Sequence, residues 1–551
     1  MKTSATERNI SSIVTRRRFL ADTSKVAAGM ALFSAPWCGS ESLATPPTSA
    51  DRLSATITID PAPPCHTINA NIYGSFIEHI GRCIYGGVYE EGSSLSDENG
   101  FRKDVMAAAR DWGIPILRWP GGNFASNYHW LDGVGPKAQR PRRYNIAWFE
   151  EESNHFGTDE FVAYCRKINS EPYLCVNLGT GTIDEAANWV EYCNGTANTS
   201  YANLRRKNGY PGPHNVKYWG LGNEMYGPWQ VGTKSAEDYA KLARECAKMM
   251  KWVDPSIKLV ACGSEDSEWN RVVLEHLVNL ADYISLHDYE GTNDYYEMLG
   301  SVRRVEALIR RTSQAIEDTD HLRGKSDPIL ALSLPDIKDK KKIEIACDEW
   351  NIWYRKWNIW RRDIPNPVEE TYNLRDALWT ASVLNLFQRM GNVVTMANLA
   401  QMVNAIAPIF TNEEGLYLQP IYFPMELYRR ECGSQFLSSD VQSPTFSSKS
   451  YRDVPYLDVS PTMSTDEKQI ALAVVNRHET ASIATKVELR RGPLAGNATV
   501  YEINGANSSV ENSFTSPHNV GTTQKSINIS GQEFDYDFPA HSITLIKLQR
   551  A

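Results

Sequence analysis

Two apolar stretches of the sequence each end on a glutamate. The segment VKYWGLGNEMYG, residues 216–227, runs through mostly apolar or aromatic residues to a glycine and then to Asn223 and Glu224. The segment IEIACDEWNIWY, residues 343–354, carries Glu349 at its polar end. If both stretches are buried strands, two carboxylates stand at strand ends, where they could divide the roles of proton donor and nucleophile between them.

From residue 66 onward, one pattern repeats: a short apolar run ends in polar residues, and an amphipathic stretch of helical length follows. The eight runs are NIYGSFIEH, PILRWPGGN, PYLCVNLGTG, VKYWGLGNE, IKLVACGSE, ADYISLHDY, IEIACDEW and VVTMANLAQ. The clearest helices are expected over 101–112, 158–168, 235–252, 301–316 and 371–390. Eight such units predict an α/β fold, a parallel (β/α)8 TIM barrel, because strands covered on both faces are continuously apolar.

An open doubly wound sheet is the structural alternative to the barrel. No GxGxxG follows the first apolar run, however, and GTGT at Gly179 lacks the Lys-Ser/Thr of a phosphate loop. The barrel is therefore the preferred prediction.

In a barrel of this kind the carboxyl ends of the strands form one rim, where active sites are built. Glu224 would end the fourth strand and Glu349 the seventh, so the two can face each other across the mouth. The other strand ends add polar and aromatic side chains: Glu78, Asn123, Asn223, His287, Tyr289, Gln401, Trp119 and Trp350. This set suits glycoside hydrolysis, in which one acid protonates the leaving oxygen and one carboxylate attacks the anomeric carbon.

Six segments occur in order between about Tyr73 and about Tyr428: GSFIEHIGRCIYGGVYE, LRWPGGNFASNYHWLDGVGP, WGLGNEMYGPW, SLHDY, CDEWNIWY and QMVNAIAPI. Together they closely resemble the family 51 glycoside hydrolases, the retaining α-L-arabinofuranosidases. The resemblance implies a barrel with a C-terminal β-sandwich, no cofactor and, often, a homo-oligomer. It also implies that Glu224 is the general acid/base and Glu349 the nucleophile. Further residues would bond to the arabinofuranose ring: Glu78, Asn123, Asn223, Tyr289 and Gln401.

The function implied is release of terminal non-reducing α-L-arabinofuranosyl residues from arabinan, arabinoxylan or arabino-oligosaccharides by double displacement. Another retaining barrel glycosidase, such as an endoglucanase or xylanase, would use the same two glutamates. A pocket closed by the loops around Gly87 and Trp130 would favour removal of single residues, and an open cleft would favour chain cutting. A non-catalytic carbohydrate-binding or scaffolding protein is the third interpretation, although it would not need both carboxylates.

Two departures from the family pattern leave the polymer preference open. The sequence has LRWPGG where a tyrosine is common before the proline, and HDYE where a second aromatic residue often follows Tyr289.

Three rim assignments have structural alternatives. Asn223 could cap a turn, but its expected role is to bond to the hydroxyl next to the anomeric carbon. His287 has no second His or Cys at ligand spacing, so we expect an oriented histidine near the nucleophile and no metal. The indoles fit core packing as well as sugar platforms: Trp119, Trp130, Trp350 and Trp353.

The first 44 residues resemble a twin-arginine export signal. Three arginines, 16–18, precede Phe19-Leu20 and a modest apolar stretch. Cleavage after Ala44 fits the small residues there, whereas Cys38 as a lipoprotein site is disfavoured by the preceding APW. The sequence therefore predicts export to the periplasm or the exterior.

Beyond about Gly433 the sequence changes to short β-rich segments separated by Ser, Asn, Gly and Thr: QIALAVVNRH, ATKVELRRG, ATVYEING, QKSINIS and HSITLIKLQ. These predict a β-sandwich over residues 434–551, with the barrel over 66–433. The N-terminal segment 45–65 contains SATITIDP, which has the same alternation and is expected to join the sandwich as an edge strand.

Composition narrows the function classes. The chain has 551 residues, of which 42% are hydrophobic, enough for more than one domain. A net charge of −9 and a pI near 5.8 provide no basic stripe, so nucleic acid is not an expected partner. No stretch approaches the roughly 18 apolar residues of a membrane span. The ten cysteines show no close CxxC pair, and most stand inside apolar runs as small buried hydrophobes.

Overall fold

The computed structural model describes residues 53–325, 334, 342–356, 366–494 and 496–551. The predicted export segment, with Ala44 and Cys38, lies outside these residues. Among the helices that are described, none combines the length and the apolar character needed to cross a membrane.

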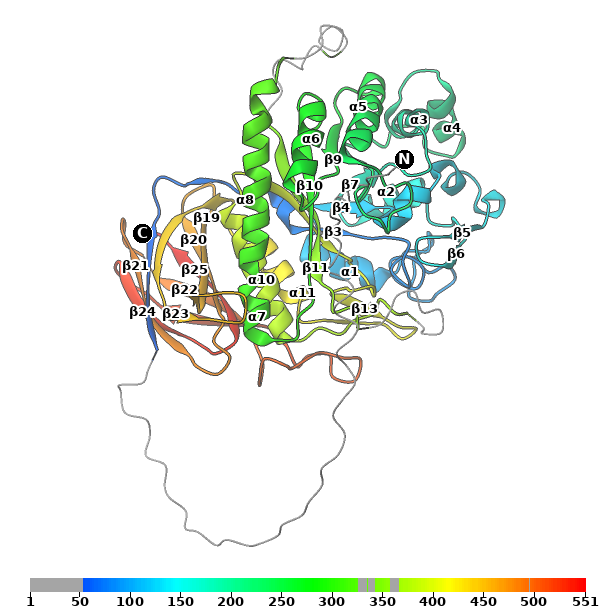
Figure 1. Cartoon of the computed structure of the whole chain (residues 1–551). Coiled ribbons are helices and arrows are strands. Elements are labelled where there is room, and N and C mark those ends of the chain that lie inside the picture. The colour runs from blue at the N-terminus through cyan, green and yellow to red at the C-terminus, as the bar shows by residue number, and fades with distance from the viewer. Residues whose placement is uncertain (1–52, 326–333, 335–341, 357–365, 495) are drawn as a thin grey trace, which may run out of the picture. The chain divides into compact units, whose positions relative to one another are not determined.

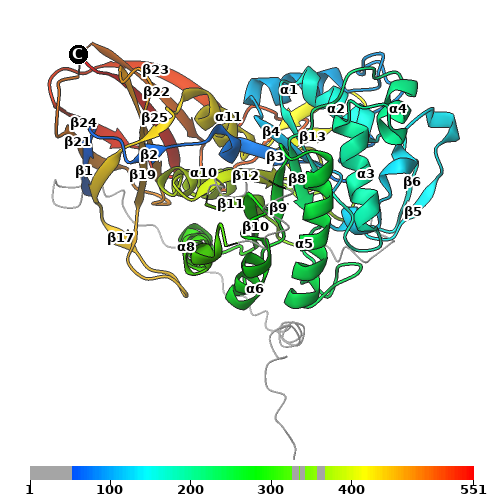
Figure 2. The same cartoon turned by 90° about the horizontal axis from the view of Figure 1, so that it is seen from above.

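A closed barrel of eight parallel strands carries the rim (Figures 1 and 2). Around the barrel the strands are β3 (Gly74–Phe76), β4 (Ile116–Trp119), β7 (Glu171–Cys175), β8 (Tyr218–Leu221), β9 (Lys258–Ala261), β10 (Tyr283–Glu290), β11 (Glu344–Ile352) and β12 (Val394–Ala400). β12 closes the circle by pairing with β3. Each of the eight predicted runs supplies one strand, so the predicted TIM barrel is confirmed.

The five predicted helices all form, with ends shifted by a few residues. They are α1 (Lys103–Trp112), α2 (Thr158–Lys167), α5 (Ala236–Val253), α8 (Val302–Thr319) and α10 (Leu374–Arg389). Helices that we did not predict are α3 (Ile183–Asn194), α4 (Ser200–Lys207), α6 (Ser267–Leu277), α7 (Tyr295–Gly300) and α11 (Tyr422–Glu431). Side-chain caps fix several starts; for example, the Ser235 side chain accepts a hydrogen bond from the Asp238 backbone N–H at the start of α5.

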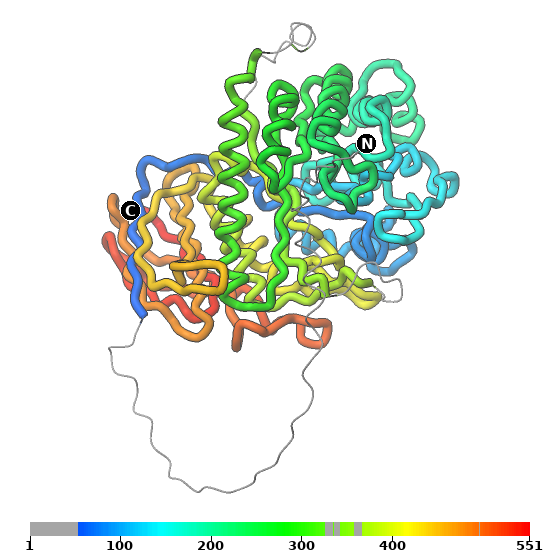
Figure 3. The backbone as a smooth tube through the Cα atoms, in the orientation of Figure 1, coloured from blue at the N-terminus to red at the C-terminus, as the bar shows by residue number. Residues whose placement is uncertain are grey.

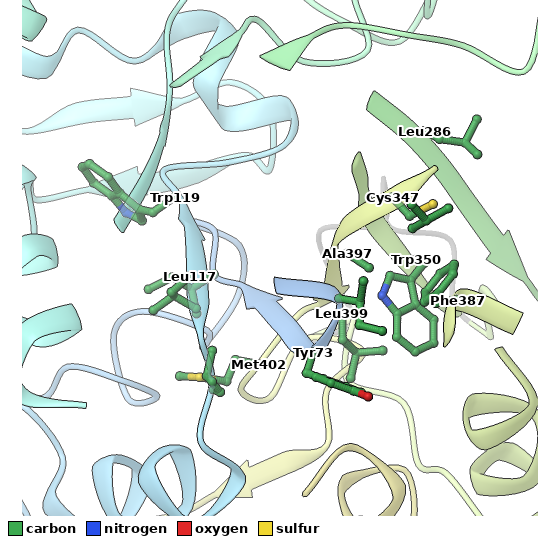
Figure 4. Packing of buried hydrophobic residues seen from close by; sticks show 14 of the residues in the cluster. Tyr73, Leu117, Trp119, Leu286, Cys347, Trp350, Phe387, Ala397, Leu399 and Met402 are labelled. Atoms are coloured by element: carbon green, nitrogen blue, oxygen red, sulfur yellow. The ribbon is translucent and has the colours of Figure 1, made fainter. Parts of the chain in front are cut away.

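Two apolar layers hold the barrel. Inside it, seven of the strands contribute one side chain each to a small cluster: Ile116, Tyr173, Tyr218, Val260, Tyr283, Ala346 and Met396. Outside it, side chains from the strands pack against the surrounding helices (Figure 4). There Trp350 of β11 meets Phe387 of α10 with ring centroids 5.3 Å apart. The strands are apolar on both faces for this reason.

Two antiparallel-rich sheets form the C-terminal sandwich. The first contains β16 (Ser438–Gln442), β1 (Ser54–Asp60), β21 (Ile483–Leu489) and β24 (Glu533–Phe538). The second contains β2 (His66–Thr67), β15 (Gln435–Phe436), β19 (Leu457–Met463), β20 (Gln469–Asn476), β25 (Ser542–Gln549), β22 (Asn497–Asn504) and β23 (Gly521–Asn528). Their facing side chains form a separate core. Short hairpins lie elsewhere: β5–β6 (Arg143–Asn145, Glu150–Glu152), β13–β14 (Ile409–Thr411, Leu416–Leu418) and β17–β18 (Thr445–Phe446, Val454–Pro455).

The N-terminal strand β1 runs along the C-terminal strands (Figure 3). It is antiparallel to β16 and parallel to β21, so it lies inside its sheet and not at the edge we expected. A second correction concerns β2, which we had placed in the barrel. It pairs with β15 in the seven-stranded sheet, so the barrel proper begins after residue 67.

Helix α10 joins the barrel to the sandwich, and 14 of its 16 residues are buried. Asp458 of β19 accepts hydrogen bonds from Asn385 Nδ2 at 2.9 Å and Arg389 Nη1 at 2.7 Å. Arg477 Nη1 lies 3.1 Å from the same carboxylate. We call Asp458, Arg389, Arg477 and Asn385 the junction cluster.

Nine cysteines fall within the described residues, none of them in a disulfide, and seven are buried. This confirms their interpretation as small buried hydrophobes. Cys65 is exposed and Cys432 is partly buried.

Candidate active site

Glu224 and Glu349 meet at the carboxyl rim, as their strand-end positions predict. Glu224 follows β8 after a sharp turn, in which Gly222 has φ 79° and Glu224 itself has φ 43°. A non-glycine residue in this left-handed region is strained, and such strain collects at functional sites. One carboxylate oxygen of each glutamate and a ring nitrogen of His287 all lie within 4.8 Å of one another.

The carboxylate of Glu349 is held by two donors. Arg118 Nη1 of β4 donates a hydrogen bond to Oε1 at 2.6 Å, and the Tyr289 hydroxyl donates one to Oε2 at 2.8 Å. Arg118 also donates through Nη2 to Asn223 Oδ1 at 2.6 Å. One fully buried guanidinium therefore fixes the positions of Glu349 and of the amide beside Glu224. The sequence analysis missed Arg118, although an arginine inside the apolar run PILRW was a usable signal.

His287 of β10 bridges three carboxylates. Its Nδ1 lies 3.1 Å from Glu224 Oε1 and 3.5 Å from Glu349 Oε2, and its Nε2 lies 3.2 Å from Asp348 Oδ1. Burial alone would lower the pKa of His287, but the charges of Glu349, Asp348 and Glu224 outweigh burial and raise it to about 10. The three carboxylates thus orient His287 and favour its protonated form. The sequence analysis did not single out Asp348.

Glu224 has a second neighbour that the sequence analysis missed. Trp229 Nε1, five residues along the chain, donates to Glu224 Oε2 at 2.5 Å. Burial raises the pKa of Glu224, but the hydrogen bond and positive charge of His287, together with Trp229, lower it overall below its ordinary value.

Glu78 follows β3, two strands away from the strand that carries Glu349. Its Oε2 accepts from Gln401 Nε2 at 3.0 Å, and its Oε1 accepts from Trp148 Nε1 at 2.9 Å and from the Phe124 backbone N–H at 3.0 Å. Burial raises the pKa of Glu78 to about 7, in spite of the Phe124 hydrogen bond. A Cβ on Gly122 would lie 2.4 Å from Glu78 Oε2, so glycine is required there.

Two amides complete the predicted set. Asn223 Nδ2 is buried and has no hydrogen-bond partner within the described part of the chain, which leaves one donor for another molecule. Asn123 begins η2 (Asn123–Asn127) directly after the glycine that abuts Glu78, and it is partly buried. All eight predicted site residues therefore come from the rim end of the barrel.

For the tryptophans, the sequence left two interpretations open: core packing and sugar binding. Trp119, Trp130 and Trp350 are fully buried and belong to the core. Trp130 stacks on Trp189 of α3 with planes 2° apart, so its indole serves core packing and not sugar binding. Trp148, on the loop between β5 and β6, reaches the site instead through its bond to Glu78. Trp353 is partly buried and packs edge-on against Tyr289 at 5.6 Å.

Glu224, His287 and Glu349 are also the one trio of His, Cys, Asp or Glu ligand atoms that cluster closely within the described residues. Each already bonds to a protein donor or to another member of the trio. The expectation that the enzyme needs no metal stays a prediction.

Comparisons with known proteins agree with this geometry. Two family models match, the alpha-L-arabinofuranosidase 1 domain over residues 108–306 and the alpha-L-arabinofuranosidase C-terminal domain over residues 348–542. Alpha-L-arabinofuranosidase C of Emericella nidulans is 40% identical over 511 residues, covering 89% of this chain and 97% of that protein. An intracellular exo-alpha-(1->5)-L-arabinofuranosidase of Halalkalibacterium halodurans is 40% identical over 455 residues, covering 80% and 88%.

A solved structure gives the same result. The thermostable GH51 alpha-L-arabinofuranosidase of Thermotoga petrophila superposes with a TM-score of 0.81 at 43% identity, covering 90% of this chain and 100% of that one. The identity extends over the barrel and the sandwich together. The chain therefore belongs to glycoside hydrolase family 51, the α-L-arabinofuranosidases.

Proposed function

We propose that this α-L-arabinofuranosidase is a retaining enzyme. It would remove terminal non-reducing arabinofuranosyl residues from arabinan, arabinoxylan or arabino-oligosaccharides by double displacement. The observation that carries this proposal is the closeness of the two catalytic glutamates, whose nearest oxygens lie within 4.8 Å. Retaining glycosidases hold the two carboxyl groups about 5–5.5 Å apart, whereas inverting ones hold them about 6.5–9.5 Å apart with a water in between. An oxygen of one glutamate so close to an oxygen of the other leaves little room for that water and supports retention.

Glu349 is the nucleophile in this proposal. Arg118 and Tyr289 fix its two oxygens, so the carboxylate is already aimed before the sugar arrives. It attacks the anomeric carbon, the bond to the leaving oxygen breaks, and a glycosyl–enzyme ester forms. Water then attacks the same carbon and returns Glu349 to the carboxylate.

Glu224 is the acid/base, and His287 supplies its proton. A general acid must be protonated in the first step, yet the positive charge of His287 lowers the pKa of Glu224 in the free site. His287 Nδ1, 3.1 Å from Glu224 Oε1, is therefore placed to hold the proton that the two groups share. As Glu349 loses its charge to the new bond, the attraction that holds this proton on His287 weakens. The proton passes through Glu224 to the leaving oxygen, and hydrolysis of the ester restores it.

The remaining rim groups bind the sugar ring. Glu78 and Gln401 form one joined pair of hydrogen-bonding groups, and Asn223 Nδ2 is the spare donor on the nucleophile's side. A bond from Asn223 to the hydroxyl next to the anomeric carbon would strengthen in the transition state. Asn123 is assigned to the same ring.

Azide rescue of two variants tests the roles. Glu224→Ala should slow substrates with poor leaving groups far more than activated aryl arabinofuranosides, which leave without a proton. Glu349→Ala should lose turnover of both kinds. Azide should give a retained glycosyl azide with the Glu224 variant and an inverted one with the Glu349 variant, as read by NMR. Inverted product from both, or near-normal activity in either, would contradict the assignment.

Export is a separate proposal, supported by the arginines at 16–18 and the apolar stretch after them. The Halalkalibacterium relative is named an intracellular enzyme, so family membership does not decide the location. Replacing Arg16 and Arg17 with Lys should leave the precursor in the cytoplasm, as cell fractionation would measure. Unchanged export would mean that the segment is used as an ordinary secretory signal.

A further inference from the structure

The backbone turn that carries Glu224 is held at both of its ends by neighbouring buried side chains. The turn begins where β8 ends at Leu221 and closes at Met225, which is fully buried. Between these two residues φ is 79° at Gly222 and 43° at Glu224. A residue with a side chain adopts such a conformation only when the surrounding structure enforces it. Contacts outside the turn must therefore keep Glu224 in place.

The Tyr239 hydroxyl of α5 holds the first end of the turn. It donates a hydrogen bond to the Leu221 backbone oxygen at 2.8 Å and accepts one from the Cys262 backbone N–H at 2.7 Å. Tyr239 is fully buried, and its ring stacks on Trp269 of α6 with ring centroids 5.4 Å apart. One hydroxyl therefore ties the end of β8 to the residue that follows β9.

The Cys262 thiol holds the second end of the turn. Its Sγ accepts a hydrogen bond from the Met225 backbone N–H at 3.4 Å, and the thiol donates to the Gly263 backbone oxygen at 3.7 Å. Burial holds the pKa of Cys262 well above its ordinary value, so the group stays a neutral thiol and is not a nucleophile. Cys262 thus serves as a hydrogen-bonding group next to Glu224.

These contacts act on a different part of the turn from those at the rim. Arg118 bonds to the side chain of Asn223, and His287 contacts the carboxylate of Glu224. Tyr239 and Cys262 instead bond to the backbone before and after Glu224. A shift of that backbone would move the carboxylate without removing it, and a misplacement of about 1 Å at a reacting group can cost roughly 10²-fold in rate.

We propose that Tyr239 and Cys262 are positioning residues, which set the place of the Glu224 carboxylate relative to the leaving oxygen. This inference rests on the proposed role of Glu224 as the acid/base. Glu349 lies on β11 and is held by Arg118 and Tyr289. Loss of either positioning residue should therefore impair proton transfer to the leaving group more than attack by Glu349.

The dependence on the leaving group tests the role of Cys262. In Cys262→Ala, kcat/KM for α-1,5-arabinobiose, whose sugar leaving group needs a proton, should fall about tenfold more than for a dinitrophenyl arabinofuranoside. Cys262→Ser restores an acceptor for the Met225 N–H and should recover most of this loss. Cys165→Ala removes another fully buried thiol, from α2, and is the matched control that should keep the ratio of the two substrates unchanged.

Tyr239→Phe tests the other end of the turn. It removes the hydroxyl and keeps the ring on Trp269, so the same selective loss on arabinobiose is expected. Tyr422→Phe is its control, because the Tyr422 hydroxyl is also buried and donates to the Ala108 backbone oxygen at 2.8 Å. Both variants should lower the melting temperature, but Tyr239→Phe alone should change the ratio of the two substrates.

Glu224→Ala separates this inference from the proposed function. It should show the same selectivity with a larger loss, because the acid itself is removed. If Glu224→Ala affects both substrates alike, the proposed role of Glu224 fails, and the inference fails with it. If Glu224→Ala is selective, an unchanged ratio or an equal loss on both substrates in Cys262→Ala or Tyr239→Phe would overturn the positioning role of that residue alone.

Discussion

Two buried ionic clusters of this protein differ in their balance of charge. In the junction cluster, one carboxylate, Asp458, faces two guanidiniums, Arg389 and Arg477, and an amide. At the rim, four carboxylates share two cations: Glu78, Glu224, Asp348 and Glu349 with Arg118 and His287. In the junction cluster the pKa of Asp458 is lowered, although burial would raise it. At the rim the pKa of Glu224 is lowered, whereas the pKa values of His287 and Glu78 are raised.

The difference separates a structural cluster from a catalytic one. Burial and perturbed pKa values occur in both, so neither identifies a site by itself. The rim differs in its excess of carboxylates and in a buried donor, Asn223 Nδ2, without a partner in the described residues. Where carboxylates outnumber cations, a proton can be shared among them and can move when one carboxylate forms a bond to the sugar. A hydrogen-bond donor without a protein partner can bind a substrate hydroxyl.

Removing the Arg118 cation from the rim should have the largest effect. Arg118→Met keeps an unbranched chain in place of the arginine stem but removes the guanidinium, and with it the hydrogen bonds to Glu349 and Asn223. The kcat/KM on an aryl arabinofuranoside should therefore fall about 10³-fold. Arg389→Met removes a cation from the junction cluster and is the matched control, expected to lower the melting temperature and keep kcat. Equal kcat losses in both variants would show that the rim and the junction cluster do not differ in their importance for catalysis.

Removing the acid at the junction should affect folding and not catalysis. Asp458→Asn leaves the buried guanidinium of Arg477 and the partly buried one of Arg389 without their counter-charge. It should lower the free energy of unfolding by about 3 kcal/mol, measured by urea denaturation. Glu306→Gln, in an exposed pair with Arg310, is the control and should change it far less.

The pH dependence of stability gives the sign of the Asp458 contribution. Because folding lowers its pKa, Asp458 stabilises the protein above the ordinary aspartate pKa of 3.8, and this stabilisation is lost as the pH falls below it. The Asn variant should therefore show a weaker loss of stability in acid than the wild type. An unchanged acid profile would show that Asp458 is not the group concerned.

The raised pKa of Glu78 should appear in the pH profile of activity. Its ionised form accepts three hydrogen bonds, so we expect kcat/KM to rise with pH along a limb near pH 7. Glu78→Gln cannot ionise and should lose this limb, with kcat/KM at pH 8 lowered about tenfold. A limb near pH 7 that persists in the Gln variant would assign it to another group.

The raised pKa of Glu78 changes stability with pH in the opposite direction from the lowered pKa of Asp458. Folding raises the pKa of Glu78 from 4.5 to about 7, so stability is greatest at low pH, where the carboxyl is neutral in both states. It declines as the pH rises from 4.5 through 7. Glu78→Gln should remove this decline.

The smallest effect is expected at Trp148. Trp148→Phe removes one hydrogen bond to Glu78 and keeps the aromatic ring, so KM should rise roughly fivefold. Since this bond lowers the pKa of Glu78, the acidic limb should also move to higher pH. Trp252→Phe, at an exposed position, is the control. A change in KM without movement of the acidic limb of the pH profile would show that Trp148 acts on the sugar alone.

Local pattern was sufficient for much of the fold. Eight strands were predictable because parallel strands are covered on both faces and leave unbroken apolar runs, each ended by polar residues. β19 was missed because Asp458, Ser460 and Pro461 interrupt its apolar pattern. The side chains of Asp458 and Ser460 find hydrogen-bond partners in α10. The sequence analysis did not predict α6, which lies between two of the predicted strands.

The sequence by itself determined the eight barrel strands and the strand-end positions of Glu224 and Glu349, since these follow from residue order and periodicity. The family resemblance added the roles of the two glutamates. Only the tertiary structure decided that Arg118 joins Glu349 to Asn223, that Trp148 reaches Glu78, and that three carboxylates surround His287 and raise its pKa. The physical reason is the distance along the sequence over which each property is set. The apolar pattern of a strand depends on the burial of that strand alone. Hydrogen bonds and pKa shifts depend on side chains from distant strands, which meet only when the barrel closes.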